Sequence, residues 1–508
     1  MRLKELLGAI TPLKVAGRSE LDIAGVCHDS RRARRGDLFF ALAGSRTDGN
    51  RHARQACERG AVAVASELDP PPPPVVLDAC WIQVADITQA MGRLCDRFFG
   101  HPSQAMTVVG VTGTKGKTTT TYFLESIFSQ CGAKPAVIGT VDHRLGGKRL
   151  EKAINTTPIS LELLSLLARF RDGGATHVAM EVSSHALALK RADEVDFNAA
   201  VFTNLGRDHL DFHKSQDEYF QAKARLFELL EKPSSAKNPR VAVINADDAK
   251  APALRRLARK AEPIGFGFNE GADLRARELT PEAAGQSFIM DWRGRSSRAS
   301  IGLIGPHNAL NALAAAGAAL GLGLPLDGVR KGLSALKSVP GRLEPVGQGQ
   351  PFRVLVDYAH TEEALSSVLG TLKETGARRL ITVFGCGGDR DRGKRGPMGI
   401  AACRGSDLAI ITSDNPRSED PLSIIRDIEQ GLKKERLKNY KIIPDRREAI
   451  GEAIDSAAEG DIVLIAGKGH EDYQILSDKT VPFDDREVAR QALVRRGWLG
   501  RSGSRISR

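Results

Sequence analysis

The residues with the clearest chemical potential form a glycine-rich segment over residues 110–119, which reads GVTGTKGKTT. The segment directly follows a short apolar run and precedes a helical pattern. Glycines allow backbone N–H groups to curl around phosphate oxygens, and the N-terminus of a following helix adds positive potential. Lys117 could then reach the β- and γ-phosphates of a nucleotide, and the Thr118 hydroxyl could hold Mg²⁺. The strict pattern of such loops needs glycine where Val111 stands, so we interpret the segment as a variant phosphate-binding loop rather than a flexible surface turn.

Two later apolar runs end in residues that could ligate a metal ion. Glu181 ends one run in the segment EVSSH, and Asp208 and His209 follow another in TNLGRDH. Carboxylate oxygens suit Mg²⁺, and a single imidazole is tolerated among its ligands. A histidine or carboxylate that is hydrogen-bonded for structural reasons is the alternative at each position. The phosphate-binding pattern upstream favours the metal site.

Two loops in the C-terminal third have compositions that suit charged ligands. Residues 385–395, GCGGDRDRGKR, are rich in glycine and arginine, as expected for a loop that grips an anion, although a solvated basic loop has the same composition. Residues 414–417, DNPR, place a carboxylate, an amide and a guanidinium within four positions, and Pro416 stiffens the turn. Such a set could clamp a zwitterion, with Arg417 on its carboxylate. An Asx-turn with an exposed arginine is the alternative.

The elements that must position these groups are short apolar runs that alternate with helical patterns. This alternation predicts βα units around mostly parallel sheets, and ligands of such sheets bind beyond the carboxyl ends of the strands. Lys223 lies within a helical pattern, YFQAKARLFELL, and from the residues alone it is a surface lysine. A buried, Ala-rich helix is expected over residues 309–322. Strands are expected over residues 37–43, 61–65, 106–111, 177–180, 199–202, 241–244, 353–356, 380–384, 408–412, 442–443 and 461–465.

Length and composition exclude several classes of protein. A chain of 508 residues predicts about three domains, and its 41% hydrophobic and 27% charged content is typical of a soluble globular protein. No apolar stretch reaches the ~18 residues of a membrane span, and Lys4 and Glu5 stand where a signal peptide is apolar, so we expect a cytoplasmic protein without stable membrane insertion. Seven cysteines without a CxxC pair indicate neither a disulfide framework nor a zinc site.

The basic balance of the chain leaves two kinds of partner open. The net charge of +11 suits nucleic acid as well as small substrates that carry phosphates and carboxylates. Only 5% of the residues are aromatic, and no stretch interleaves basic and aromatic side chains as a stacking platform would require. We therefore expect small-molecule partners and no nucleic acid. The proline run over residues 70–74 is expected to form a polyproline surface loop, and the arginine-rich C-terminal tail a solvated end.

Taken together and in order, the motifs resemble those of the Mur ligases, the amino-acid-adding enzymes of peptidoglycan precursor synthesis. Each motif is weak alone, but the ordered set is specific and spans nearly the whole chain apart from the C-terminal tail. The motifs are HDSR, GDLFFAL, GVTGTKGKTTT, NTTP, EVSSHAL, TNLGRDHLDFH, GPHNALNALAA, VPGRLE, DYAHT, GCGGDRDRGKR, DNPR and GKGHED.

The resemblance implies an α/β chain of three domains that uses ATP and Mg²⁺. Residues 1–102 would form a smaller N-terminal domain for the UDP-sugar, residues 103–339 a central P-loop ATPase domain with a mostly parallel sheet, and residues 340–508 a Rossmann-like domain for the incoming amino acid. A carboxylate would be activated as an acyl phosphate and then attacked by an amine. A monomer is expected.

DNPR and GKGHE are most similar to the family members that add meso-diaminopimelate to UDP-N-acetylmuramoyl-L-alanyl-D-glutamate. Lysine-adding members typically lack the arginine that is Arg417 here. The same reaction with L-lysine is the alternative within the family. A P-loop ATPase stimulated by nucleic acid, motivated by the basic charge, is the alternative from another class, and a catalytically idle binding protein on the same scaffold is a third.

The resemblance also assigns expected roles to individual residues. ATP contacts are expected at Gly113, Thr114, Lys115, Gly116, Lys117, Thr118, Thr119, Asn308, Arg342 and Asp357. Contacts to the UDP-muramoyl-dipeptide are expected at Ser30, Ser45, Arg46, Thr47, Asn155, Thr156, Thr157, Ser183 and Arg191. Contacts to diaminopimelate are expected at Arg390, Asp414, Asn415, Pro416, Arg417, Gly467 and Glu471. Metal ligands are expected at Thr118, Glu181, His209 and Lys223, the last as a carbamate, and catalytic roles at Lys117, Lys223 and His209.

Two positions depart from the pattern of the family. Leu189 stands where diaminopimelate-adding members often carry glutamine, so one polar contact to the UDP substrate is missing or made elsewhere. Lys115 takes a place in the phosphate-binding loop that is often asparagine, and it adds positive charge near the phosphates.

Overall fold

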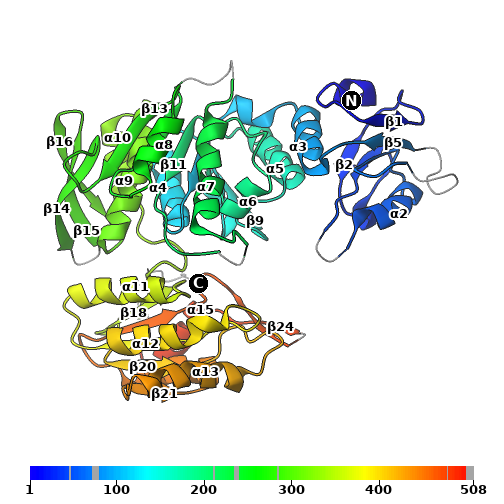
Figure 1. Cartoon of the computed structure of the whole chain (residues 1–508). Coiled ribbons are helices and arrows are strands. Elements are labelled where there is room, and N and C mark those ends of the chain that lie inside the picture. The colour runs from blue at the N-terminus through cyan, green and yellow to red at the C-terminus, as the bar shows by residue number, and fades with distance from the viewer. Residues whose placement is uncertain are drawn as a thin grey trace, which may run out of the picture. The chain divides into compact units, whose positions relative to one another are not determined.

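The computed structural model describes residues 1–44, 47–70, 79–209, 212–233, 239–282, 285–477 and 479–498. The chain divides into two compact units (Figure 1). The first comprises Met1–Arg277, Ile289–Ala299 and Leu310–Ala335, and the second Glu278–Phe288, Ser300–Ala309 and Leu336–Arg508. Both contain mostly parallel sheets covered by helices, which confirms the predicted α/β class. Ser45, Arg46, most of the proline run and the tail from residue 499 onward lie outside the described residues.

The N-terminal sheet has the strand order β1-β5-β4-β3-β2 and is parallel except for β1. Its inner strands are buried on both faces, because Leu38 and Phe40 join one hydrophobic cluster and Phe39 and Val64 another. Strands buried on both faces appear in sequence as continuous apolar runs. The elements are α1 (Leu3–Leu7), β1 (Lys14–Ala16), β2 (Gly25–Cys27), β3 (Asp37–Phe40), α2 (Ala53–Glu58), β4 (Ala63–Ser66), β5 (Cys80–Gln83) and α3 (Ile87–Phe98).

The central sheet has the order β16-β15-β14-β13-β12-β11-β6-β10-β7-β8-β9. Its parallel middle strands end together, since the register pairs Glu181 with Val111 and Phe202 with Thr112. The loops that follow β6, β10 and β11 therefore leave the sheet at one edge. The strands are β6 (Thr107–Thr112), β7 (Pro135–Ile138), β8 (Asp142–Leu145), β9 (Lys148–Lys152), β10 (His177–Glu181), β11 (Ala199–Phe202), β12 (Val241–Asn245), β13 (Glu262–Gly267), β14 (Leu274–Glu282), β15 (Gly285–Trp292) and β16 (Arg295–Ile301). The helices are α4 (Lys117–Gln130), α5 (Ser160–Asp172), α6 (Ser184–Ala188), α7 (Gln216–Leu230), α8 (Ala251–Leu257), α9 (Pro306–Gly321) and α10 (Leu326–Ala335).

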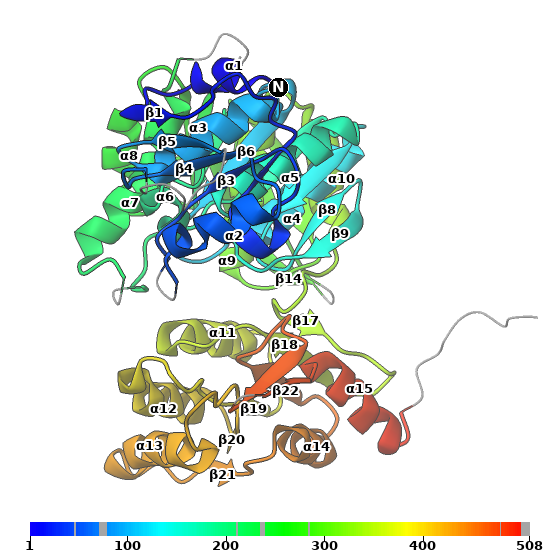
Figure 2. The ribbon, with the colours of Figure 1, turned by 90° about the vertical axis from the view of Figure 1, so that its right-hand side faces the viewer.

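The C-terminal sheet has the order β17-β18-β22-β19-β20-β21 and is parallel apart from β17. Helices α11, α12 and α13 cover one face, and α14 and α15 cover the other (Figure 2). Alternate residues of β22 serve the two faces, because Leu464 packs in the first cluster and Val463 and Ile465 in the second. The elements are β17 (Glu344–Pro345), β18 (Arg353–Asp357), α11 (Glu362–Glu374), β19 (Leu380–Phe384), α12 (Arg395–Gly405), β20 (Leu408–Ile411), α13 (Pro421–Lys434), β21 (Tyr440–Ile442), α14 (Arg446–Ser456), β22 (Ile462–Ala466), β23 (Tyr473–Leu476), β24 (Lys479–Pro482) and α15 (Asp485–Arg495).

A fully buried ion pair joins both helices of the second face to the sheet. Arg446 Nε and Nη2 donate to the two oxygens of Asp485 at 2.8 and 2.7 Å, and both side chains have no exposed surface. Arg446 Nη2 also donates to the carbonyl of Ala466 at 3.0 Å, at the end of β22. The pair therefore ties the starts of α14 and α15 to a strand end that precedes the GKGHE motif.

Removing one member of this pair leaves the other charge buried and uncompensated. We expect Asp485→Ala to lower the free energy of unfolding of this unit by about 3–5 kcal/mol. Asp455→Ala is the matched control, because the 3.2 Å pair between Asp455 and Arg495 has side chains that are 50% and 64% exposed and should contribute less than about 1 kcal/mol. Differential scanning calorimetry of the two variants measures the difference. Equal losses of stability would contradict the role given to the buried pair.

Candidate functional site

The glycine-rich loop between β6 and α4 has a backbone that only glycine fits at two positions. Gly113 and Gly116 have φ angles of 145° and 90°. A Cβ on Gly113 would lie 1.9 Å from Thr203 Oγ1, and one on Gly116 would lie 2.2 Å from Asn311 Oδ1. Both conformations and both close approaches exclude larger residues. The loop then enters α4 at Lys117, so its free N–H groups lie at a helix N-terminus.

The loop after β11 holds this backbone in place. The N–H of Thr114 donates to the carbonyl of Asn204 at 2.9 Å, and the N–H of Lys115 donates to Asn204 Oδ1 at 2.9 Å. Asn204 Nδ2 donates back to the carbonyl of Lys115 at 3.1 Å, and the N–H of Gly206 donates to Thr114 Oγ1 at 2.9 Å. Asn204 was not among the predicted site residues. Its position in the TNLG motif, directly after a strand, was the available signal.

Lys117 folds back along the loop that precedes it. Its Nζ donates to the carbonyls of Gly113 and Thr114 at 2.8 and 3.1 Å, so its ammonium lies over the loop. The next two residues, Thr118 and Thr119, are buried in the first turn of α4. Thr118 points its hydroxyl toward β10, where it meets a carboxylate.

That carboxylate belongs to Glu181, which ends β10 and is only 1% exposed. Its Oε2 accepts hydrogen bonds from Thr118 Oγ1 and Thr140 Oγ1, each at 3.0 Å, and its Oε1 accepts from the N–H of Thr140 at 2.8 Å. A Cβ on Gly139 would come within 2.6 Å of Oε1, so glycine at this position permits the approach. Thr140 was not predicted as a site residue.

Lys223 is buried, which corrects its interpretation as a surface lysine. It is 1% exposed and lies on the inward face of α7 with Tyr219, Leu226 and Leu230, which are spaced by three and four residues. Its Nζ lies 4.1 Å from the centre of the Tyr219 ring, and among the described residues no carboxylate is within ion-pair distance of it. Burial, and secondly the charge of Lys117, hold the pKa of Lys223 well below the ordinary value of a lysine, while Asp208 acts in the opposite direction.

His209 lies near the same tyrosine. It adopts a left-handed backbone with φ of 52°, its side chain is 47% exposed, and its Nε2 is 3.7 Å from Asp208 Oδ2. Its ring centre lies 4.7 Å from that of His185 and 6.2 Å from that of Tyr219. The described residues contain no group of three His, Cys, Asp or Glu side chains arranged to hold a metal ion. The structure thus brings Thr118 to Glu181, and it places Lys223 and His209 beside Tyr219.

The two threonines of NTTP are joined to the end of β10 by separate routes. Thr156 Oγ1 lies 3.1 Å from Thr140 Oγ1. Thr157 Oγ1 donates to the main-chain oxygen of Glu181 at 2.9 Å and accepts from the N–H of Ser183 at 3.0 Å. Arg191 Nη1 donates to the carbonyl of Thr157 at 3.1 Å, and burial lowers the pKa of this half-buried arginine. Four residues predicted to contact the muramoyl-dipeptide therefore form one cluster.

The remaining residues predicted for the UDP substrate are spread more widely. Ser30 is buried after β2 and donates from Oγ to Gln55 Oε1 at 2.7 Å. Thr47 and Asn155 are exposed, and Leu189 is 41% exposed at the end of α6.

Three residues predicted to contact ATP belong to the second unit, where Asp357 ends β18 and Asn308 lies in the first turn of α9. The carboxylate of Asp357 is buried and accepts from the N–H groups of Leu343 and Ala359, both at 2.8 Å. Burial raises the pKa of Asp357, and the nearby Arg342 opposes that effect. The guanidinium of Arg342 lies 4.9 Å from the centre of the Tyr358 ring. Asn308 Nδ2 donates to the carbonyl of Ile304 at 2.7 Å.

The DNPR and GKGHE motifs meet at the carboxyl ends of β20 and β22. Asn415 Nδ2 donates to Glu471 Oε2 at 2.9 Å, and Tyr358 Oη donates to Glu471 Oε1 at 3.4 Å. Lys468, which has no exposed surface, donates to Asn415 Oδ1 at 3.1 Å and to Glu471 Oε2 at 3.2 Å. Asp414 lies beside them and is 8% exposed. Lys468 was not among the predicted site residues, although it lies within the GKGHE motif.

The neighbouring turn is equally close-packed. Arg417 has a left-handed φ of 51°, and its Nη1 donates to the carbonyl of Gly388 at 2.7 Å. A Cβ on Gly388 would lie 1.9 Å from the carbonyl oxygen of Pro416, and one on Gly467, whose φ is 116°, would lie 2.7 Å from Asp414 Oδ2. The predicted zwitterion set is therefore assembled by backbone contacts between three loops.

In the arginine-rich loop over residues 385–395, two arginines form ion pairs with carboxylates and one does not. Arg395 is fully buried and donates to Glu419 and Asp427 at 2.7 and 2.8 Å, and Arg392 pairs with Asp427 at 3.0 Å. Of the arginines in this loop, Arg390 alone has no carboxylate of the described residues within ion-pair distance, and it is exposed. Two arginines thus stabilise the loop, and Arg390 is available to an anion.

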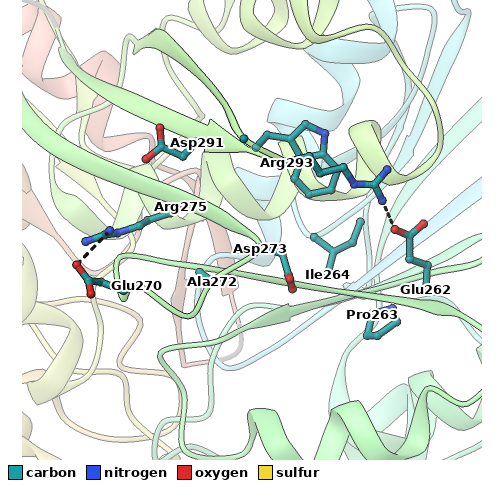
Figure 3. A pocket seen from close by; sticks show the side chains of 11 residues that line it. Glu262, Pro263, Ile264, Glu270, Ala272, Asp273, Arg275, Asp291 and Arg293 are labelled. Atoms are coloured by element: carbon teal, nitrogen blue, oxygen red, sulfur yellow. Dashed lines mark hydrogen bonds and ion pairs between the residues drawn. The ribbon is translucent and has the colours of Figure 1, made fainter.

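A pocket of about 450 Å³ lies among β13, β14 and β15 (Figure 3), and none of the predicted site residues line it. Its four carboxylates are each matched by an arginine. Glu262 contacts Arg293, Glu270 lies 3.6 Å from Arg275, Asp273 lies 2.8 Å from Arg255, and Asp291 lies 2.9 Å from Arg277. Arg275 and Arg293 line the pocket, whereas Arg255 and Arg277 pair with its carboxylates from outside the lining.

Comparison with known proteins identifies the class to which this fold and these loops belong. Residues 22–99 match the Mur ligase family catalytic domain, residues 111–319 the Mur ligase middle domain, and residues 341–469 the Mur ligase glutamate ligase domain. The chain belongs to the Mur ligase family.

Two relatives and one solved structure that it resembles carry the name of the same ligase. It is 46% identical to the UDP-N-acetylmuramoyl-L-alanyl-D-glutamate–2,6-diaminopimelate ligase of Solibacter usitatus, over 98% of this chain and 99% of the relative. It is 43% identical to the ligase of that name from Syntrophomonas wolfei, over 97% and 99%. A solved structure of such a ligase is 33% identical, with a TM-score of 0.70 over 98% and 99% of the two chains. The fold is also shared with the MurF ligase of Thermotoga maritima in complex with ADP, at 20% identity and a TM-score of 0.63 over 93% and 98%.

Among the described residues, no helix is both long and apolar enough to cross a membrane.

The fit of the glycine-rich loop to a nucleotide can be tested by substituting two glycines that both have a left-handed backbone conformation. Gly116→Ala should weaken ADP binding by about 10-fold or more, because its Cβ would displace Asn311 and shift the loop. Gly132→Ala is the matched control, since Gly132 has a φ of 79° just after α4 and no atom within 4 Å of the place that an alanine methyl group would take. Both changes should destabilise the fold by about 1–2 kcal/mol. Calorimetric titration with ADP separates them, and equal affinities would contradict the geometry.

Proposed function

We propose that the chain is an ATP-dependent ligase that joins meso-diaminopimelate to the D-glutamate of UDP-N-acetylmuramoyl-L-alanyl-D-glutamate, with release of ADP and phosphate. The observation that carries the proposal is the cluster of Asp414, Asn415, Arg417 and Glu471 beyond the carboxyl ends of β20 and β22, since it offers both charges of a zwitterion a partner. The 46% identity to a UDP-N-acetylmuramoyl-L-alanyl-D-glutamate–2,6-diaminopimelate ligase over nearly the whole chain supports it.

The proposal includes a division of labour among three domains. Residues 1–102 bind the UDP-sugar, with Ser30, Ser45, Arg46 and Thr47 as its contacts. Residues 103–339 bind ATP and the dipeptide. Residues 340–508 bind the incoming amino acid. We further propose that the enzyme acts as a monomer in the cytoplasm, where ATP and UDP-linked precursors are available, without nucleic acid as a partner.

In the first half-reaction, the side-chain carboxylate of D-glutamate attacks the γ-phosphorus of ATP, and ADP leaves. In the loop Gly113–Thr119, the N–H groups at the start of α4 and the ammonium of Lys117 bind the phosphates and offset the charge that spreads over the transferring oxygens. Phosphoryl transfer depends mainly on such positioning and charge stabilisation. Asn308, Arg342 and Asp357 are the proposed contacts of the nucleotide in the second unit.

In the second half-reaction, the neutral amine of diaminopimelate attacks the acyl phosphate. A tetrahedral intermediate forms, phosphate is expelled, and the amine loses its proton. Thr156, Thr157, Ser183 and Arg191 hold the dipeptide during both steps. The amide bond formed is the product of the reaction.

The donors near the phosphate-binding loop fit Mg²⁺. The Thr118 hydroxyl and the buried Glu181 carboxylate are hard oxygen donors only 3.0 Å apart. His209 and a carbamate on Lys223 would complete the set. When bound, the ion neutralises phosphate charge at the reacting centre.

The environment of Lys223 suits carbamate formation. A carbamate forms when a neutral amine attacks CO₂ and loses a proton, and burial together with Lys117 favours the neutral amine because both lower the pKa of Lys223. The product is an anion. The ammonium of Lys117 would stabilise this anion, whereas it disfavours the protonated form of Lys223. The carbamate oxygens of Lys223 could then serve as ligands of Mg²⁺.

The zwitterion set also explains the choice of amino acid. Arg417 binds the distal carboxylate of diaminopimelate, and Asp414, Asn415 and Glu471 bind the distal ammonium. L-Lysine has no distal carboxylate, so Arg417 would be left without its partner in a closely packed turn. Sites built to pair a polar group discriminate strongly against analogues that lack it. Arg390, Pro416 and Gly467 are the other proposed contacts of diaminopimelate.

The test of the function is phosphate release by the purified protein with ATP, Mg²⁺ and UDP-N-acetylmuramoyl-L-alanyl-D-glutamate. We expect release to require meso-diaminopimelate, with kcat/KM at least about 100-fold above that for L-lysine, and an amide product by mass spectrometry. Release with lysine alone would overturn the role given to Arg417. ATP hydrolysis that responds to DNA or RNA and not to the UDP substrate would overturn the ligase itself.

The proposed carbamate predicts a specific form of rescue. Lys223→Ala should lower kcat by about 100-fold or more, and added formate or acetate should restore part of it by supplying the missing carboxylate. Lys250→Ala is the matched control, because the Lys250 ammonium also faces an aromatic ring, at 4.8 Å from the Phe220 centre, but its side chain is 33% exposed. A loss of activity that no carboxylate restores would count against the carbamate.

A further inference from the structure

Thr140 lies between two parts of the first unit, the phosphate side at Thr118 and Glu181 and the dipeptide side at Thr156. The proposed mechanism gives Thr140 no role. Thr140 follows β7, whose parallel register pairs Ile138 with Met180 of β10. Two residues beyond the last pair, the chain passes the end of β10. Thr140 is therefore placed beside Glu181 by the sheet itself.

Thr140 grips the carboxylate of Glu181 with two donors. Its N–H donates to Oε1 at 2.8 Å and its hydroxyl donates to Oε2 at 3.0 Å. Gly139 makes this approach possible, because a side chain there would meet Oε1. Hydrogen bonds to a buried charged group are among the stronger ones in proteins. They define the plane of the carboxylate that also accepts from Thr118.

The same hydroxyl reaches the dipeptide side. Thr140 Oγ1 lies 3.1 Å from Thr156 Oγ1. A hydroxyl has a single proton, and a carboxylate can only accept, so the proton of Thr140 goes to Glu181. The proton of Thr156 must then go to Thr140. The chain of donation runs from Thr156 through Thr140 to Glu181, and Thr156 is left with lone pairs for a ligand that donates.

The other threonine of NTTP does not share this route. Thr157 bonds to the main-chain oxygen of Glu181 and to the N–H of Ser183, and so it braces the strand end rather than the carboxylate. Among the described residues, Thr140 is the hydroxyl that joins the carboxylate to a dipeptide-side threonine.

We propose that Thr140 is a positioning residue that couples the phosphate side of the site, at Thr118 and Glu181, to the dipeptide side, at Thr156. The inference rests on the proposed function, since it takes the NTTP threonines to face the UDP substrate. Binding of Mg²⁺ and nucleotide changes the charge that Glu181 presents to Thr140, and the donation chain passes that change to Thr156. The affinity for the UDP substrate then depends on whether nucleotide and metal are bound, and the reverse holds equally.

The test compares Thr140→Val, which removes the hydroxyl but keeps the shape and the N–H, with Thr140→Ser, which retains the hydroxyl. Thr176→Val is the matched control, because Thr176 immediately precedes the start of β10 and its hydroxyl bonds to the main chain of Lys134. Calorimetry measures the Kd of UDP-N-acetylmuramoyl-L-alanyl-D-glutamate with and without Mg²⁺ and a non-hydrolysable ATP analogue. No turnover is involved.

We expect the analogue and Mg²⁺ to tighten binding of the UDP substrate by about 5-fold or more in the unsubstituted protein. Thr140→Val should reduce this effect to less than about 2-fold and so raise the Kd of the ternary complex by about 2- to 3-fold or more. Thr140→Ser and Thr176→Val should retain it. Coupling that is absent from the unsubstituted protein, or intact in Thr140→Val, would overturn the inference alone. Failure of the unsubstituted protein to bind the UDP substrate would overturn the proposed function, and the inference with it.

Discussion

The buried carboxylate of Glu181 is the constraint on which the first unit is organised. A charge that is 1% exposed is costly unless hydrogen bonds replace its water. Three donors do so here, two from Thr140 and one from Thr118. Their positions require that β6, β7 and β10 end at the same edge of the sheet, that α4 begins beside that edge, and that residue 139 is glycine. The parallel register satisfies all of these conditions together.

The same edge explains why the phosphate-binding loop tolerates its departure from the strict pattern. Val111 is buried in β6, so the loop proper begins at Gly113 rather than at a glycine in position 111. The support comes from the next strand along the sheet, since Asn204 bonds to the backbone of both Thr114 and Lys115. The loop after β11 thus helps to fix the backbone conformation of the phosphate-binding loop, which in the strict pattern depends on glycine at position 111.

Eleven of the 24 strands in the described residues were predicted, because most of those eleven are buried and appear as continuous apolar runs. The buried strands β5 and β7 were not predicted. The strands over residues 199–202 and 380–384 match the structure at both ends, and the other predicted strands differ by one to three residues. The β14–β16 segment was not predicted, because the exposed halves of β14 and β16 are polar and carry no such run.

The candidate site was predictable where a motif follows a strand, and less so where burial decides the chemistry. Lys223 has the spacing of an inward-facing residue with Tyr219 and Leu226, but a lysine in an amphipathic helix is usually assigned to solvent. Thr140 carries no motif at all. Its contact with Glu181 arises from the pairing of β7 with β10, which brings together residues 41 positions apart. The local spacing of residues cannot predict such a contact.

Two buried lysines show how the surroundings of one residue type decide its chemistry. Lys468 has no exposed surface, yet its ammonium has Glu471 and Asn415 as acceptors, and both belong to the proposed zwitterion set. Its charge is thereby balanced within the protein, and its hydrogen bonds orient Asn415 so that the amide nitrogen faces Glu471. Lys223 is equally buried but has an aromatic ring and a second cation as its neighbours, so burial and the charge of Lys117 lower its pKa and disfavour its charged form. The fold thus surrounds one buried lysine with acceptors from the DNPR and GKGHE motifs and the other with an aromatic ring and a second cation, and the difference lies in the partners that it provides.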